Sequence, residues 1–211
     1  MSAPTAPVDI CNLSQDLLKQ EPITSIDTPS DPAETIYARW YDPCRRALLR
    51  AHTWNFAIRR RVLTPTGTAP AFGYSDAYNL PNDYLRLASI GDDSLGDFRR
   101  DYEIEDGQLL MTNDAGDLNL RYVYDLTTVT KFDALFVDLL ALYQAVRLSN
   151  KFNISSSLKT ELKADFKTAW ANAMTIDGQE RPPVRIQTSK LLARRQGMRT
   201  SNNAKFVVFP D

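Results

Sequence analysis

The sequence is poor in the residue types that most often build chemical sites. Its 211 residues include one histidine, two cysteines and eight glycines. A lone histidine with no nearby cysteine or second histidine cannot form a zinc site, so we expect His52 to lie at a helix C-terminus, where the helix dipole favours it. Two cysteines, Cys11 and Cys44, are too few for a disulfide framework, and we expect free thiols in a reducing compartment. The glycines form no phosphate-binding pattern.

Long apolar runs and catalytic constellations are also missing. No run of about 18 apolar residues occurs, so we expect no membrane span, and residues 1–5 lack the basic and apolar regions of a signal peptide. No serine or cysteine stands in the context of an activated nucleophile. Residues 91–97 lack the ligand spacing of a calcium loop, and Asp133, which could be paired with Asp125, is explained by helix capping. We therefore expect no catalytic residue, cofactor or metal, and folding in a cytoplasm.

Charge is distributed unevenly along the chain. The protein has 25 basic and 26 acidic residues, but residues 181–211 hold seven of the bases and only one of the acids. The first 180 residues therefore carry a net charge of −7 and the last 31 a net charge of +6. An acidic body does not suit general nucleic-acid binding, whereas a basic segment suits an acidic groove on a partner or a phosphate backbone.

Residues 181–211, called the tail below, have the composition of a chain that does not fold alone. Pro182 and Pro183 open the tail, an apolar run closes it, and little helical or strand periodicity lies between. Such a segment buries too little apolar surface to offset the entropy of ordering it. We predict that it binds a partner through its bases and its apolar end: Arg185, Lys190, Arg194, Arg195, Arg199, Lys205, Phe206, Val207 and Phe209.

Apolar residues at three- and four-residue spacing predict four helices, at residues 8–20, 31–51, 132–150 and 158–174. The second helix has Asp31 as its N-cap, and Pro43 should kink or restart it. Its apolar stripe is expected at Ile36, Trp40, Ala47, Leu48 and Ala51. The third is apolar over most of its circumference and is therefore expected at the centre of the helices. Gly178 is expected to end the fourth helix as its C-cap.

Alternating patterns between these helices predict strands near residues 55–63, 74–80, 84–90, 102–104, 108–111 and 119–125. Asp106-Gly107 is a strong hairpin signal, and short strands joined by tight turns indicate an antiparallel sheet. The order predicts an α+β fold. Residues 1–54 and 131–180 form a four-helix bundle, residues 55–130 form an antiparallel β domain inserted between helices 2 and 3, and residues 181–211 form an extended C-terminal tail.

Three consecutive arginines, Arg59, Arg60 and Arg61, stand in the first predicted strand. Such a basic strand can be solvated, can form salt bridges to another subunit, or can face DNA in a channel, and we favour the first two alternatives. Trp54 and Phe56 directly precede the arginines and are expected to anchor the corner between helix and strand in the core.

Five stretches of the sequence, in this order, resemble the tail tubular protein A family, the head-to-tail adaptors of short-tailed phages. Each stretch is short, so the resemblance depends on their order and spacing and covers about residues 9–180. The stretches are Ala47-Leu48-Leu49-Arg50-Ala51-His52-Thr53-Trp54-Asn55-Phe56-Ala57, Tyr78-Asn79-Leu80-Pro81-Asn82-Asp83-Tyr84-Leu85-Arg86, Tyr102-Glu103-Ile104-Glu105-Asp106-Gly107, Leu120-Arg121-Tyr122-Val123-Tyr124 and Phe132-Asp133-Ala134-Leu135-Phe136.

The resemblance implies a non-enzymatic structural virion protein. Family members form a ring of twelve copies under the portal protein, and their C-terminal extension docks onto the portal. The far side of the ring receives the nozzle or tail tubular protein B, and genomic DNA passes through the channel without sequence-specific contact. The implied location is the virion tail, after assembly in the host cytoplasm, with no membrane contact.

Two other classes of function stay open. The first alternative is a nucleic-acid-binding module that uses the basic tail and the three arginines, whose binding to DNA would depend steeply on salt. The second is an enzyme, which would need a cluster of catalytic residues that the sequence does not show.

Overall fold

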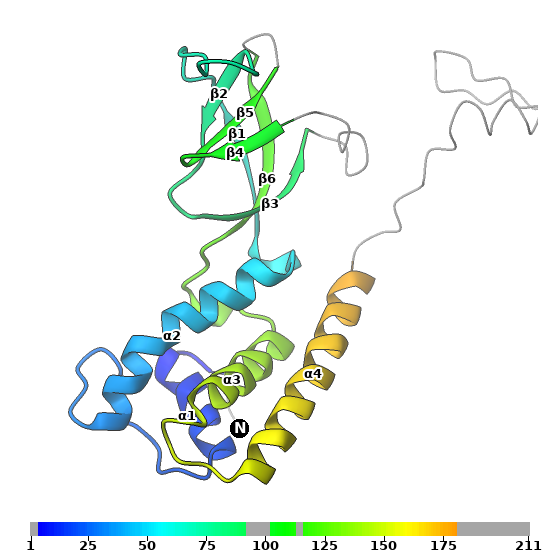
Figure 1. Cartoon of the computed structure of the whole chain (residues 1–211). Coiled ribbons are helices and arrows are strands. Elements are labelled where there is room, and N and C mark those ends of the chain that lie inside the picture. Colours follow the sequence, from blue (N-terminus) through cyan, green and yellow to red (C-terminus); the bar gives the residue numbers. More distant parts are fainter. Residues whose placement is uncertain (1–3, 92–101, 113–115, 181–211) are drawn as a thin grey trace, which may run out of the picture. The chain divides into compact units, whose positions relative to one another are not determined.

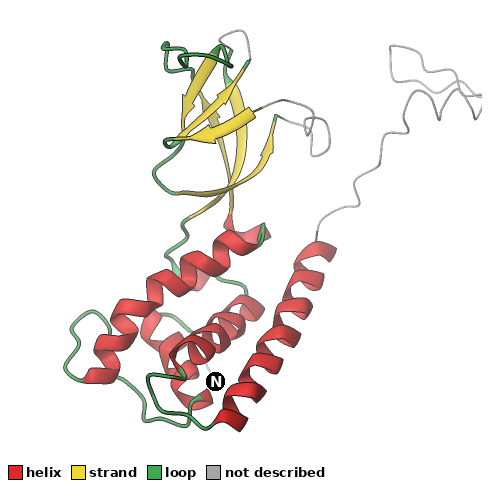
Figure 2. Ribbon diagram, viewed as in Figure 1, coloured by secondary structure: helices red, strands yellow, loops and turns green. Residues whose placement is uncertain are grey.

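The computed structural model describes residues 4–91, 102–112 and 116–180, and helices and strands form separate groups within them (Figures 1 and 2). The fold is mixed, as predicted. The described helices are α1 (Pro7–Leu17), α2 (Pro32–Ala51), α3 (Ala134–Leu148) and α4 (Ser156–Gln179), with short 3-10 turns at Asn55–Ala57 and Val129–Lys131.

Two small antiparallel sheets lie between α2 and α3 in the sequence (Figure 1). The first sheet has the order β1-β6-β3 and the second the order β2-β5-β4. The strands are β1 (Ile58–Leu63), β2 (Asp76–Asn79), β3 (Tyr84–Ile90), β4 (Tyr102–Glu105), β5 (Gln108–Met111) and β6 (Leu118–Tyr124). Asp106 and Gly107 have positive φ angles and join β4 to β5, so the predicted hairpin is confirmed. The first strand begins three residues later than predicted, because residues 55–57 form a 3-10 turn.

Helix α3 lies at the centre of the helical part, because it contacts α1, α2 and α4. Phe136, Leu139, Leu140 and Leu148 are fully buried along it. Its N-cap is Asp133, whose side chain accepts a hydrogen bond from the Leu135 N–H. The predictions of a buried third helix and of a capping role for Asp133 are therefore confirmed.

Helix α2 bears out the prediction only in part. Of the two outcomes predicted at Pro43, a restart does not occur, because the helix continues through the proline. Proline has no N–H, so the Arg39 carbonyl lacks a helical partner there, but both residues are exposed and water can bind that carbonyl. Of the predicted stripe, Leu48 is buried, Ile36 and Trp40 are partly buried, and Ala47 and Ala51 are exposed. The other buried positions include Tyr37, Tyr41, Cys44 and Leu49.

Gly178 does not end α4, which contradicts the prediction. The helix continues to Gln179, and the N–H of the C-cap residue Glu180 donates to the carbonyl of Ile176. The C-cap residue Glu180 has right-handed backbone angles, so the helix end does not use at this position the left-handed conformation that favours glycine. The start of α4 is earlier than predicted, because the Ser155 side chain caps the helix by accepting from the Leu158 N–H.

Strand β6 contributes to two apolar cores. Its residues Leu118, Leu120 and Tyr122 pack in the core of the sheets, as the predicted alternation requires. Val123, on the opposite face of the strand from these residues, is fully buried in the core of the helices. The strand therefore joins the two cores at this residue. In the core of the helices, Cys11 and Cys44 are buried free thiols, as predicted.

Candidate functional site

An aromatic cluster marks the corner where α2 leads into β1. The Trp54 side chain is buried, and its ring makes edge contacts with Phe136 of α3 at 5.4 Å and Trp170 of α4 at 5.8 Å between centroids. The Phe56 ring contacts Phe136 at 5.1 Å. The indole N–H donates to the Leu48 carbonyl at 2.9 Å, so the polar atom of the tryptophan is satisfied inside the core. The predicted anchoring role of Trp54 and Phe56 is confirmed.

Arg45 joins α2 to the segment that follows β6. The side chain is 2% exposed, and its guanidinium donates to Asp42 at 2.9 Å and to Asp125 at 2.5 Å. The same guanidinium donates to the carbonyl of Leu126 at 2.6 Å. A buried guanidinium is tolerated only when carboxylates and carbonyls satisfy its charge and its donors. This arginine therefore holds the chain in place where it leaves the sheets.

Two arginines form a reciprocal contact between the end of α2 and β3. Arg50 of α2 donates to the carbonyl of Leu85 on β3. Arg86 of β3 donates in return to the carbonyl of Ala51 at 2.9 Å, at the end of α2. Carbonyls at a helix C-terminus lack helical partners and carry partial negative charge, so a cation there is favourable.

Helix α4 contacts the same corner through Asp177. One carboxylate oxygen lies 3.0 Å from His52 Nε2, and the other accepts from the backbone N–H of Asn55 at 2.7 Å. The Asn55 side chain donates to the Asp177 carbonyl at 2.6 Å. His52 lies at the C-terminus of α2, as predicted, and it also pairs with a carboxylate that sequence spacing did not reveal.

The three arginines of β1 have different environments. Arg59 pairs with Asp83, and its guanidinium lies 3.8 Å from the centroid of the Tyr124 ring. Tyr122 donates to the same Asp83 carboxylate at 2.9 Å, and its pKa is raised mainly by burial and by this hydrogen bond. Arg59 is therefore engaged within its own chain. Arg60 and Arg61 are exposed, and no ion pair is found for them among the described residues.

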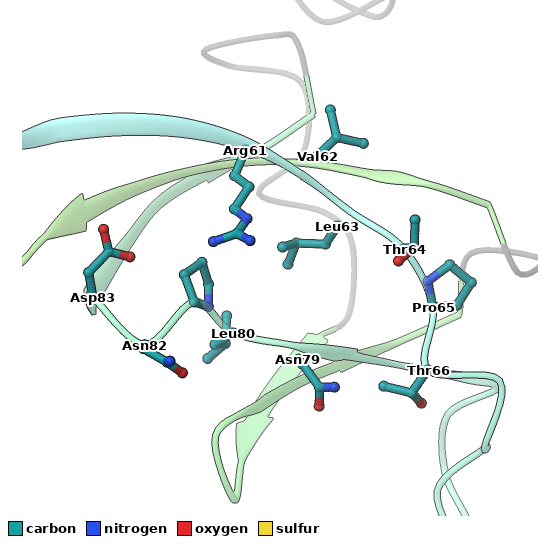
Figure 3. Close-up of a pocket in the computed structure, with 11 residues that line it drawn as sticks. Arg61, Val62, Leu63, Thr64, Pro65, Thr66, Asn79, Leu80, Asn82 and Asp83 are labelled. Carbon is teal, nitrogen blue, oxygen red and sulfur yellow. The ribbon is translucent and has the colours of Figure 1, made fainter.

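A groove of about 510 Å³ runs beside the end of β1 (Figure 3). One wall comes from residues 61–66 and the other from residues 79–83. Arg61 and Leu63 point from β1 toward the side of Leu80, whereas Val62 points to the other side of the strand (Figure 3). A second groove of about 370 Å³ is lined by residues of the β1–β2 loop and the β4–β5 hairpin. Phe72 of the same loop is 89% exposed.

Charge also marks the edge of the second sheet. All four residues of β4 are exposed, and they include Glu103 and Glu105. Sequence reasoning singled out neither residue for this role, although the alternation of acidic and apolar residues in Tyr-Glu-Ile-Glu could have indicated an exposed edge strand. The basic edge β1 and the acidic edge β4 are the most distinctive exposed features of the described sheets.

The predicted tail residues, from Arg185 to Phe209, lie outside the described residues, and so does most of the acidic turn at residues 91–97. Within the described ranges, no group of three or more histidine, cysteine or acidic side chains is placed to hold a metal ion. None of the helices in those ranges has the length and apolarity needed to cross a membrane.

Comparison with known proteins adds no relative. The sequence matches no protein-family model and no curated protein. The candidate site therefore depends on the residues themselves: a joined corner between helices and sheets, and two oppositely charged strand edges.

Proposed function

We propose that this protein is a head-to-tail adaptor of a short-tailed phage, a non-enzymatic ring component that joins the portal protein to the nozzle or tail tubular protein B. In this proposal about twelve copies surround a channel through which genomic DNA leaves the virion. Residues 1–54 and 131–180 act as a helical bundle, residues 55–130 as an inserted β domain, and residues 181–211 as the portal-binding tail.

One observation carries the proposal. Four of the five stretches through which the sequence resembles the adaptor family meet at the corner between helices and sheets. Trp54 of the first stretch contacts Phe136 of the last. Asp83 of the second accepts a hydrogen bond from Tyr122 of the fourth. Residues up to 82 positions apart in sequence thus build one packed joint.

A packed joint of this kind suits a protein that transmits mechanical force between two assemblies. The aromatic cluster, the buried guanidinium of Arg45 and the reciprocal arginine contacts hold the helices and the sheets together. A channel component needs such a connection, because one end binds the portal while the other meets the tail. The basic tail adds a segment whose charge complements an acidic groove.

Removal of the tail tests the portal contact. We expect a chain truncated after residue 180 to keep the melting temperature of the full chain, because the residues before the tail build the core of the helices and the core of the sheets. The same truncation should abolish co-elution with purified portal. In the full chain, reversal of Arg194 and Arg195 to Glu should weaken the association mainly at low salt, because exposed charges are screened at high salt. Full-strength portal binding by the truncated chain would contradict the proposed role of the tail.

The nucleic-acid-binding alternative retains one supporting observation, the exposure of Arg60 and Arg61. It predicts binding to duplex DNA that weakens steeply with salt and that is lost with the tail. Fluorescence anisotropy with a labelled duplex separates the two functions. An adaptor should bind portal at physiological salt and bind free DNA only weakly.

A further inference from the structure

Each of the two sheets has a charged strand at one edge, and the two charges are opposite in sign. Among the described strands, β1 pairs only with β6, and β4 pairs only with β5. β1 exposes Arg60 and Arg61, while β4 exposes Glu103 and Glu105. Arg60 stands opposite Arg121 in the register of β1 and β6. Each strand is therefore an edge strand of its sheet among the described residues, and its exposed charges are of one sign.

Apolar side chains accompany both edges. Tyr102 and Ile104 of β4 are 39% and 42% exposed, and Val62 of β1 is 57% exposed. Tyr102 and Ile104 are in register with Met111 and Leu109, which are fully buried in the core of the sheets. The apolar face of the second sheet thus continues to an uncovered edge. An additional strand beside β4 would cover it.

The charges determine which edges can meet. Two β1 edges repel each other, and so do two β4 edges, whereas β1 and β4 attract. A contact between β1 of one copy and β4 of another is heterologous, since each copy uses two different surfaces. It leaves one free edge of each kind, so the contact repeats from copy to copy and closes into a ring when the rotation allows.

We infer that β4 of one copy binds along β1 of the next copy, with Glu103 and Glu105 on the same face as Arg60 and with Tyr102 and Ile104 on the face of Arg61 and Leu63. This inference rests on the proposed function, because it supplies a subunit interface for the proposed ring. Duplex DNA fits the two edges less well. A phosphate backbone would attract β1, but it would repel β4 and would leave Tyr102 and Ile104 uncovered.

Charge reversal in three variants tests the contact. One variant carries Arg60→Glu and Arg61→Glu, the second carries Glu103→Arg and Glu105→Arg, and the third carries all four substitutions. Sedimentation velocity follows assembly of the full chain, alone and with the portal ring added. We expect each double variant to raise the dissociation constant between subunits at least about tenfold, because like charges then meet at the interface. The fourfold variant should recover assembly, because its reversed edges attract again.

Mixing the two double variants gives a stricter test. Each is repelled by its own kind, but an alternating mixture pairs acidic β1 with basic β4, and basic β1 with acidic β4. Assembly should therefore return on mixing at a ratio of one to one. Matched control variants, Lys163→Glu with Lys167→Glu and Glu161→Arg with Asp165→Arg, reverse exposed charges on α4 and should assemble like the wild type. Circular dichroism confirms that every variant is folded.

The possible results separate this inference from the proposed function. A wild-type chain that stays monomeric under both conditions overturns the inference, and so does a glutamate variant that assembles normally. If only the arginine variant is impaired and DNA binding is lost with it, β1 faces DNA and the inference is wrong. If the reversals behave as expected but portal does not bind, the subunit contact stands and the adaptor function fails.

Discussion

The helical part and the β part of this chain reach stability in different ways. Among the described residues, the core of the helices includes 24 buried apolar side chains and the core of the sheets only eight. Four of the six large apolar residues that are exposed in the described part of the chain lie in the β part: Val62, Phe72, Tyr102 and Ile104. A part with a small core and exposed apolar edges gains most from a partner that covers them. We therefore expect the helices to contribute most of the stability, and the sheets to gain stability from a bound partner.

The largest expected loss of stability comes from a substitution in the core of the helices. Leu139 on α3 is fully buried, so Leu139→Ala should lower the free energy of unfolding by about 2–5 kcal/mol, through lost transfer energy and the cavity left behind. Chemical denaturation measures this change. Leu142 is only partly buried and should cost less when truncated. Val62→Ala in the β part is the control, and its stability should be nearly unchanged because the side chain is 57% exposed. An unchanged denaturation midpoint for Leu139→Ala would show that α3 is not in the core.

The second largest expected loss of stability comes from a substitution at the joint between the helices and the sheets. Arg45→Leu removes the partner of the buried Leu126 carbonyl and of Asp125, so we expect a loss of about 1–3 kcal/mol. The neighbour Arg46 is the matched control, since its Nε lies 3.4 Å from the Asp125 carboxylate and its side chain is 56% exposed. Arg46→Leu should cost about 0–1 kcal/mol. Equal losses in the two variants would contradict a structural role specific to Arg45.

Much of the fold could be predicted from the sequence because its signals are local. Helical spacing, the Asp31 and Asp133 caps and the Asp106-Gly107 turn each depend on a few neighbouring residues, and these elements appear near the predicted positions. The buried face of α2 was placed wrongly because tyrosine was not counted as a core residue. Tyr37 is fully buried, and its hydroxyl donates to Ser14 at 2.8 Å, which satisfies the polar atom.

The candidate site was less accessible to sequence reasoning. Arg45 and Asp125 are 80 positions apart, and so no spacing rule connects them. Asp177 and Asn55 are 122 positions apart. Which carboxylate meets which cation is determined by how the helices and sheets pack, and that packing depends on the whole chain. The three arginines of β1 were visible as a run, but only the structure shows that Arg59 contacts Asp83 and Tyr124 and that Arg60 and Arg61 are exposed.

The smallest expected effect concerns a loop of the helical part and depends on pH. Glu34, in the first turn of α2, accepts hydrogen bonds from the backbone N–H groups of Ser30, Thr24 and Ser25 and from the hydroxyls of Thr24 and Ser30. These bonds favour the ionised carboxylate and hold the pKa of Glu34 well below its usual range, the Ser30 N–H being the largest cause. No expectation from the sequence assigned Glu34 a role in organising this loop.

The loss of stability in Glu34→Gln should therefore depend on pH. A carboxylate with a lowered folded-state pKa contributes stability that is present above its unfolded pKa of about 4.3 and is lost as the pH falls below that value. The difference in free energy of unfolding between wild type and Glu34→Gln should be largest near neutral pH and should shrink as the solution is acidified below the unfolded pKa. Urea denaturation across this range measures it. The exposed Glu21 is the control, and Glu21→Gln should change stability little at any pH. A difference for Glu34→Gln that stays constant with pH would mean that the charge of Glu34 does not organise the loop.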